Sequence, residues 1–248
     1  MKLYNYQLVI EYIGTNFVGW QIQKRGVSIQ GEIQKVLRKF IKKDLKLLGS
    51  GRTDSGVHAL GQSAHFIINH KIKPKKILTT LNHFLKKKGI SILSIKNKKK
   101  DFHSRFSAKE RKYLYVIINR EAPLTLFRNK AWHIRKKLNF NLMKRGAKIL
   151  EGKHNFSAYR SSSCSAKSPI RTLKKIQIKN RNGGRLDITF ISQSFLQQQV
   201  RSMVGCLKLL GEEKWDLRRF KKPLDTKRRE YCAPPAPPSG LYLHSVKY

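Results

Sequence analysis

One loop of the chain combines a carboxylate with the flexibility that catalysis on a large substrate needs. Residues 48–62 read LGSGRTDSGVHALGQ, with Asp54 near the middle, Arg52 two residues before it and glycines on both sides. Glycine lets a ligand's backbone approach closely, and a nearby arginine keeps a carboxylate ionised. An ionised carboxylate there can attack carbon or remove a proton. An Asp between glycines is also typical of a simple turn, and the loop alone leaves both interpretations open.

The loop lacks the patterns that bind nucleotide phosphates. A P-loop has Lys followed by Ser or Thr directly after its last glycine, whereas Val57 and His58 follow Gly56 here. Gly49, Gly51 and Gly56 do not have the spacing of the dinucleotide-binding fingerprint. The His-x-Glu and PCxxC motifs of zinc deaminases are missing from the sequence. The loop therefore gives no sign of a bound nucleotide, dinucleotide or zinc ion.

Metal binding is not favoured either. Three histidines flank one apolar stretch and are more typical of structural residues than of ligands: His58, His65 and His70. The three cysteines are widely spaced and form no CxxC pair: Cys164, Cys206 and Cys232. We expect no structural zinc and no disulfide framework, which fits a reducing, cytoplasmic setting.

The charge of the chain points to a polyanionic partner. Lys and Arg number 54 against 14 Asp and Glu, so the formal net charge is +40. Residues 1–104 and residues 105–248 share this excess, so the positive charge is not confined to a separate basic tail. Such a charge favours a nucleic acid as partner. Frequent Lys, Ile and Asn are also typical of an AT-rich genome, in which case some Lys runs are only solvated surface.

The elements that hold the loop follow a recognisable order. Apolar residues make up 40% of the 248, enough for one large or two small domains. The apolar runs are too short to cross a bilayer, and the N-terminus reads as a strand, not a signal peptide. In the first part, Ser28 caps a helix over 29–41 and Pro74 opens a second helix. Strands are expected at 3–12, 45–50, 64–70 and 90–95.

The second part repeats this order. Helices are expected at 139–151, with Gly152 as C-cap, at 196–210 and, briefly, at 215–220. Strands are expected at 112–118, 170–178, 185–191 and 241–248, with Asn182-Gly183-Gly184 as the hairpin between the middle pair. The order β-α-β-β-α-β thus appears twice. It predicts an α+β protein of two ferredoxin-like (RRM-topology) halves, 1–104 and 105–248, side by side with a catalytic cleft between them.

The residues of the loop also resemble a known family. GRTDSGVHALGQ is similar to the signature loop of the tRNA pseudouridine synthase I family, the TruA type. Further segments resemble the same family in the same order along nearly the whole chain: EYIGTNFVGWQIQ, SIQGEIQ, DFHSRFSAKERKYLYVI, FLQQQVRSMVG and APPAPPSGLYL. The resemblance implies that uridine is isomerised to pseudouridine at positions 38–40 of the tRNA anticodon arm. It also implies a homodimer and a reaction without a cofactor.

The resemblance assigns roles to individual residues. Asp54 matches the catalytic aspartate, and Arg201 matches the arginine that pairs with it. Tyr113 matches the tyrosine that stacks on the target uracil, and Arg52 an arginine that helps to hold the target nucleotide extruded. The closing strand, at Leu241 or Leu243, is expected to supply an apolar floor below the tyrosine.

The chain departs from the family pattern at a few positions. The family usually has Asp where Ile13 stands, Ala where Ser55 stands, and often His near Gln198 and Gln199. These departures concern local RNA contacts and leave the chemistry intact.

Two other functions stay open at this stage. A non-enzymatic RNA-binding protein with two RRM-like halves needs RNP aromatics on its sheets, and KYLYVI is a poor match to that motif. A nucleoside or glycan hydrolase usually needs a second carboxylate, which the loop lacks.

Overall fold

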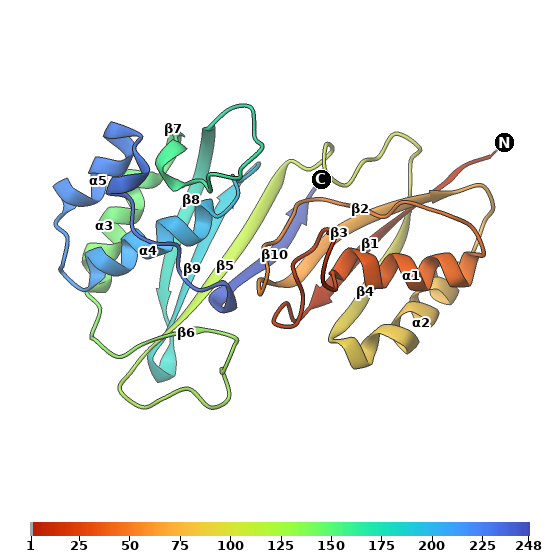
Figure 1. Ribbon diagram of the computed structural model, residues 1–248, viewed down its shortest axis with the longest axis horizontal. Helices are drawn as coiled ribbons and strands as arrows, with labels where there is room; N and C mark the ends of the chain where they lie inside the picture. The colour runs from red at the N-terminus through yellow and green to blue at the C-terminus, as the bar shows by residue number, and fades with distance from the viewer. Residues whose placement is uncertain (1) are drawn as a thin grey trace. The chain divides into compact units, whose positions relative to one another are not determined.

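The fold was analysed in a computed structural model that describes residues 2–248 (Figure 1). The chain forms two compact units. The first unit runs to Lys109 and also includes Tyr242–Tyr248, and the second is Glu110–Leu241. Each unit combines helices with strands, which confirms the predicted α+β class.

The first unit is a sheet with helices on one face (Figure 1). Its strands lie in the order β4-β1-β3-β10, and the short β2 pairs with β3. The strands are β1 (Tyr4–Tyr12), β2 (Leu48–Gly49), β3 (His58–Ile68), β4 (Ile90–Lys98) and β10 (Leu241–Lys247). The pairs among β1 to β4 are antiparallel, whereas β10 runs parallel to β3 and sets Tyr242 opposite His58.

The two helices of this unit form where the sequence predicts them. Helix α1 (Ile29–Ile41) begins after Ser28, whose Oγ accepts a hydrogen bond from the Gly31 backbone N at 3.1 Å. Helix α2 (Pro74–Leu85) begins at its proline, which has no N–H to leave unsatisfied. Both bury an apolar stripe: Ile29, Ile33, Leu37 and Ile41 in α1, and Ile77, Leu81 and Leu85 in α2.

The second unit has the same kind of layering. Its strands lie in the order β5-β9-β8-β7, and β6 runs parallel to β5. They are β5 (Glu110–Asn119), β6 (Trp132–Ile134), β7 (Gly152–Asn155), β8 (Ile170–Asn180) and β9 (Arg185–Ser192). The helices are α3 (Phe140–Leu150), α4 (Gln199–Gly211) and α5 (Leu217–Thr226), and α3 packs on both β8 and α4 (Figure 1).

Several boundaries of the second unit differ from the sequence prediction. Helix α4 begins at Gln199 and not at 196, because Gln198 has a left-handed backbone with φ of 62°. Helix α5 is longer than 215–220, because Asp216 caps it through Arg219 N and Pro223 does not end it. Strands β6 and β7 were not predicted, while the β8–β9 hairpin at Asn182-Gly183-Gly184 is confirmed.

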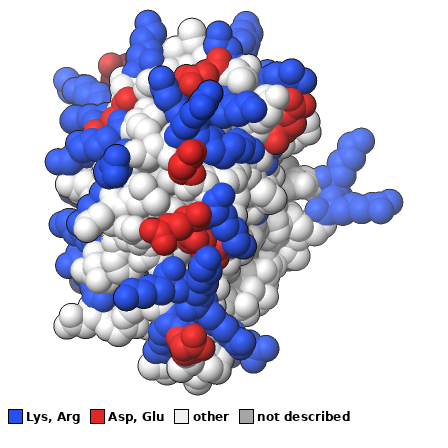
Figure 2. Space-filling model, turned by 90° about the vertical axis from the view of Figure 1, so that its left-hand side faces the viewer, with Lys and Arg blue, Asp and Glu red and all other residues white. Residues whose placement is uncertain are grey.

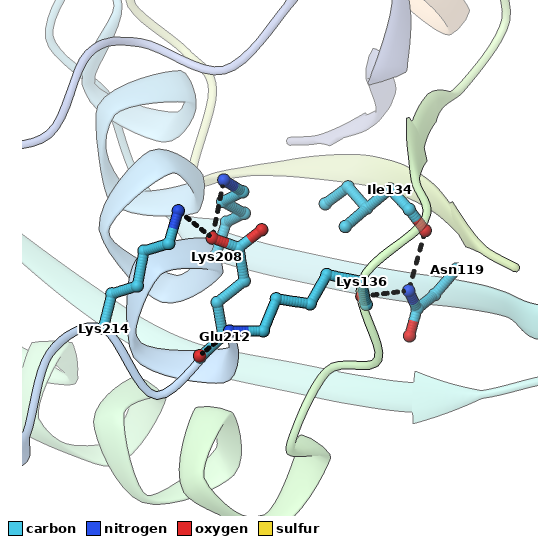
Figure 3. Close-up of polar contacts among 6 residues, drawn as sticks. All are labelled: Asn119, Ile134, Lys136, Lys208, Glu212 and Lys214. Atoms are coloured by element: carbon cyan, nitrogen blue, oxygen red, sulfur yellow. Dashed lines mark hydrogen bonds and ion pairs between the residues drawn. The ribbon is translucent and has the colours of Figure 1, made fainter. Parts of the chain in front are cut away.

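A buried carboxylate anchors the end of α4 (Figure 3). Glu212 follows the helix and forms ion pairs with Lys208 at 2.8 Å and Lys214 at 3.3 Å. Lys136 donates to the Glu212 carbonyl at 3.0 Å, and Asn119 donates to the Lys136 carbonyl at 2.8 Å. Burial raises the pKa of Glu212, but the two ammonium groups outweigh this and hold it below its usual value. The cluster therefore ties α4 to the segment after β6.

We expect Glu212→Gln to lower the free energy of unfolding by about 1–3 kcal/mol at pH 7, because two lysines lose their charged acceptor. Since the folded pKa of Glu212 is depressed, this contribution is present above the unfolded pKa and is lost as pH falls through the folded pKa. Urea unfolding at pH 7 and below pH 4 measures the difference. Glu230→Gln, in an exposed pair with Arg228, is the control and should cost less than about 1 kcal/mol; an equal loss in both variants would contradict the anchoring role.

Candidate active site

The loop with Asp54 connects β2 to β3 in the first unit. Asp54 is half-buried and Arg52 is exposed. The Val57 backbone N donates to the Asp54 carbonyl at 3.2 Å, which closes a tight turn, and Gly56 takes a φ of +75° within it. The predicted turn is thus present, and glycine is required there because other residues rarely adopt this backbone.

Thr53, directly before Asp54, is fixed from two directions. Its carbonyl accepts from the Trp20 backbone N at 3.1 Å. Its hydroxyl lies 2.7 Å from the Tyr12 hydroxyl, at the end of β1. Both oxygens of a buried residue are therefore held, so the backbone that carries Asp54 has little freedom on this side.

The residue after Asp54 is held by the same segment of chain. Ser55 Oγ donates to the Phe17 carbonyl at 3.1 Å. The family's usual Ala could not form this bond, so the departure at Ser55 adds a tether to the loop. The segment 13–20 between β1 and α1 thus supports the turn on both sides of Asp54.

Two glycines let this support approach the loop closely. A Cβ at Gly14 would lie 2.0 Å from the Val57 carbonyl oxygen, and one at Gly19 would lie 2.6 Å from the Thr53 carbonyl oxygen. Both contacts are with backbone, which cannot move aside without moving the Asp54 turn. The sequence showed the segment 11–23 only as a family resemblance, and the structure supplies its physical role.

The base of the loop is also fixed. Ser50 Oγ donates to Gln62 Oε1 at 2.8 Å, and Gln62 Nε2 donates to the Gly51 carbonyl at 2.9 Å. His58, at the start of β3, accepts from the Gly14 backbone N through Nδ1 at 3.1 Å, and its ring stacks on Tyr242. His58 is a scaffold residue here, and residues 2–248 contain no group of three or more His, Cys, Asp or Glu that could hold a metal ion.

Leu241 and Leu243 lie on β10 and are both buried. Leu243 is opposite Ala59 in the parallel pair with β3, so it neighbours the strand that leaves the Asp54 loop. Leu241 is the last residue of the second unit.

Tyr113 lies on β5 of the second unit, opposite Phe190 of β9. Its side chain is 8% exposed. The ring meets Phe195 edge to face, with centroids 5.1 Å apart. The apolar neighbours hold the ring in one orientation, as a stacking partner for a base requires.

Arg201 lies in the first turn of α4 and is clamped by the proline-rich segment 233–238. Its Nε donates to the Ala236 carbonyl at 2.7 Å, and the Ala236 backbone N donates to the Arg201 carbonyl at 3.0 Å. Tyr115 Oη donates to the next carbonyl, that of Pro237, at 2.8 Å. Burial raises the pKa of Tyr115 despite the nearby charge of Arg201, so its hydroxyl stays protonated and keeps donating.

The clamp depends on a close approach that sequence reasoning missed. A Cβ at Gly205 would lie 2.2 Å from the Pro234 carbonyl oxygen, so glycine in α4 lets the proline-rich segment pack against the helix. The sequence showed this segment only through its family resemblance and through the stiffness that its four prolines impose.

Comparisons with known proteins agree on one family. The sequence pattern of the tRNA pseudouridine synthase family matches residues 8–107 and 147–248. The chain belongs to this family. The tRNA pseudouridine synthase A of Pelagibacter ubique is 56% identical over 99% of this chain and 100% of its own. Those of Parvibaculum lavamentivorans and Sinorhizobium medicae are each 42% identical over 98% of this chain.

Membership in the tRNA pseudouridine synthase family confirms the resemblance read from the sequence, and with it the predicted isomerase activity. Among solved structures, a chain of a Cbf5-Nop10-Gar1 complex is 12% identical with a TM-score of 0.33, over 82% of this chain and 53% of its own. A similarity this weak adds nothing to the argument. No helix within residues 2–248 is long and apolar enough to span a membrane.

Proposed function

We propose that this tRNA pseudouridine synthase acts on uridines 38–40 of the anticodon arm, with Asp54 as its nucleophile or base. The observation that carries the proposal is the fixed turn around Asp54. Thr53 and Ser55, on either side of Asp54, are both hydrogen-bonded to residues 12–20. A preorganised carboxylate is worth more in catalysis than a mobile one, because no reorganisation is needed when the substrate binds.

In this proposal residues 1–104 and 105–248 form two ferredoxin-like halves that contribute to one cleft. Tyr113 stacks on the extruded uracil, Arg201 pairs with Asp54, and Arg52 helps to hold the nucleotide out of its stack. Leu241 or Leu243 lies below the tyrosine. Support comes from the rigidity of each group: Tyr113 is packed against Phe195, and Arg201 is clamped at Ala236.

The chemistry needs only these groups. The bond between C1′ and N1 breaks, the uracil turns, and C1′ bonds to C5, which loses its proton to solvent while N1 gains one. No electrons or groups are exchanged, so no cofactor takes part. Extruding the target base costs on the order of a few kcal/mol, and stacking on an aromatic ring returns about 1–3 kcal/mol.

The charge of the chain supports a whole tRNA as substrate. Lys and Arg spread over most of the face in Figure 2, with Asp and Glu in smaller groups among them. Such a surface makes many sequence-independent phosphate contacts, so the shape of the tRNA must guide the uridine to Asp54. We further propose a homodimer, as the family resemblance implies. We also propose a cytoplasmic location, in line with three cysteines that are all free.

Tritium release from tRNA transcripts labelled at uridine C5 tests the activity, since only isomerisation at C5 frees the label. We expect release from tRNAs with uridine at 38–40 and none when these positions carry cytidine. Binding without release would favour the RNA-binding alternative, and free uracil would favour the hydrolase. Release from other positions would overturn the assignment to the anticodon arm.

Arg201→Met tests the pairing with Asp54. Loss of the positive charge should raise the pKa of the Asp54 carboxylate and move the acidic limb of the pH–rate profile to higher pH. Arg218→Met, on the exposed side of α5, is the control and should leave the profile unchanged. An unshifted profile in Arg201→Met would show that Arg201 does not act on the carboxylate.

A further inference from the structure

The most exposed aromatic ring in the first unit belongs to a rigid turn. Phe106 is 75% exposed, although it lies between buried Ser104 and buried Ala108. Single exposed apolar residues are common on protein surfaces and need no explanation by themselves. Phe106 differs from them because hydrogen bonds fix its backbone and because an imidazole ring and a guanidinium group lie beside its ring.

Hydrogen bonds close the turn 103–107 around His103. Its Nδ1 accepts from the backbone N of Arg105 at 3.1 Å and of Phe106 at 3.3 Å. Its carbonyl accepts from Ser107 N at 2.9 Å, and its own N donates to Ser107 Oγ at 3.0 Å. The exposed position of the Phe106 ring is therefore built into the turn and does not come from a loose loop.

The turn is also anchored to the sheet through Ser104. Its N donates to His65 Nδ1 at 3.2 Å, and its Oγ donates to the Leu48 carbonyl at 2.6 Å. Its carbonyl accepts from Tyr248 Oη at 2.9 Å. Burial, assisted by His103, lowers the pKa of His65 to about 4, so His65 remains a neutral acceptor at pH 7.

The groups around Phe106 are those that bind nucleobases. The His103 ring lies 4.4 Å from the Phe106 ring between centroids, and the Arg105 guanidinium carbon lies 5.6 Å from the same ring. Lys98, Lys99 and Lys100 precede the turn and Lys109 follows it. An aromatic ring among cations is the usual stacking platform for single-stranded nucleic acid.

We propose that Phe106, with His103 and Arg105, stacks an unpaired base of the bound RNA at a place other than the target uridine. The turn contacts β3 at His65, seven residues along the strand from His58 beside the Asp54 loop. Seven strand residues span about 23 Å, many times the rise between stacked bases. The platform therefore holds a different nucleotide from the one that reacts, and the inference rests on RNA being the substrate.

The first test compares Phe106→Ala with the unchanged full chain on the same tRNA. We expect Kd and KM to rise about 5- to 150-fold, the equivalent of about 1–3 kcal/mol of lost stacking, with kcat within about twofold. The slope of log Kd against log salt should stay the same, because the ring carries no charge. Leu126→Ala, which removes a side chain that is 85% exposed, is the control and should change none of these.

The second test is direct. Phe106→Trp should bind tRNA normally, and its added indole should lose fluorescence on binding because a base stacks on it. Unchanged Kd in Phe106→Ala, or no added quenching in Phe106→Trp, overturns the platform even if tritium release is normal. A fall in sedimenting mass in Phe106→Ala overturns it in favour of a contact between protein copies. If the unchanged chain releases no tritium, the proposed function fails. That result is independent of the binding and fluorescence measurements, which test the platform.

Discussion

Replacement of Asp54 by Asn should reduce pseudouridine formation to less than about a hundredth of the original rate, with tRNA binding retained. The amide keeps the shape of the side chain and the turn that Thr53 and Ser55 hold. It loses the negative charge, which is needed for attack on carbon and for removal of a proton. Single-turnover tritium release and filter binding measure the two effects separately.

Asp44→Asn is the matched control for this prediction. Asp44 forms a surface ion pair with Arg38 at 2.6 Å, and its side chain is 79% exposed. The same chemical change there should leave rate and binding unaltered. If Asp54→Asn kept more than about a hundredth of the rate, Asp54 would be neither nucleophile nor essential base.

Gly14→Ala should be almost as damaging, although Gly14 does no chemistry. The added methyl would lie 2.0 Å from the Val57 carbonyl oxygen, so segment 13–20 and the Asp54 turn must separate. Displacement of a catalytic group by about 1 Å can cost on the order of 100-fold in rate. We expect such a fall in kcat and a loss of about 1–3 kcal/mol in stability, as in other overpacked sites.

Gly183→Ala separates this effect from the general cost of replacing glycine. Gly183 has a φ of +70° and open space around its Cβ position. Its replacement should cost about 1 kcal/mol of stability through the backbone alone and leave kcat unchanged. Equal kcat values in the two variants would show that segment 13–20 does not position Asp54.

Local signals in the sequence predicted the helices well and the strands less well: β3 begins at His58 and not at 64, and β2 is only Leu48–Gly49. Ser28 caps α1 through its side-chain oxygen, as expected from residue type alone. Asn139 caps α3 in the same way, although it was expected to be the first residue inside that helix. The helix start at 196 was wrong because the left-handed backbone of Gln198 depends on tertiary contacts. The pairing of β10 with β3 joins residues far apart in sequence, and an alternating apolar pattern does not specify the partner of a strand.

In the candidate site, too, the sequence indicated some residues and gave no signal for the contacts that position them. Asp54 and its glycines were visible as a pattern, and the family resemblance pointed to Tyr113 and Arg201. The contacts that position them were not visible in the sequence. These are the hydrogen bond between the Tyr12 and Thr53 hydroxyls and the one from Arg201 Nε to the Ala236 carbonyl. These bonds involve backbone atoms or a hydroxyl that meets its partner only in the folded chain, so residue type carries no signal for them.

The membership of β10 in the first unit has a consequence for synthesis of the protein on the ribosome. Residues 2–109 emerge early, but the strand that pairs with His58 and Ala59 is made only after the whole second unit. Tyr248, which donates to Ser63 Oγ and to the Ser104 carbonyl, comes later still. During translation the nascent first unit therefore waits without one strand of its sheet, while the second unit, Glu110–Leu241, is continuous and can fold as it emerges. A fragment that ends at Lys109 would remain in this waiting state, with the His58–Ala59 end of β3 lacking its β10 partner and open to aggregation.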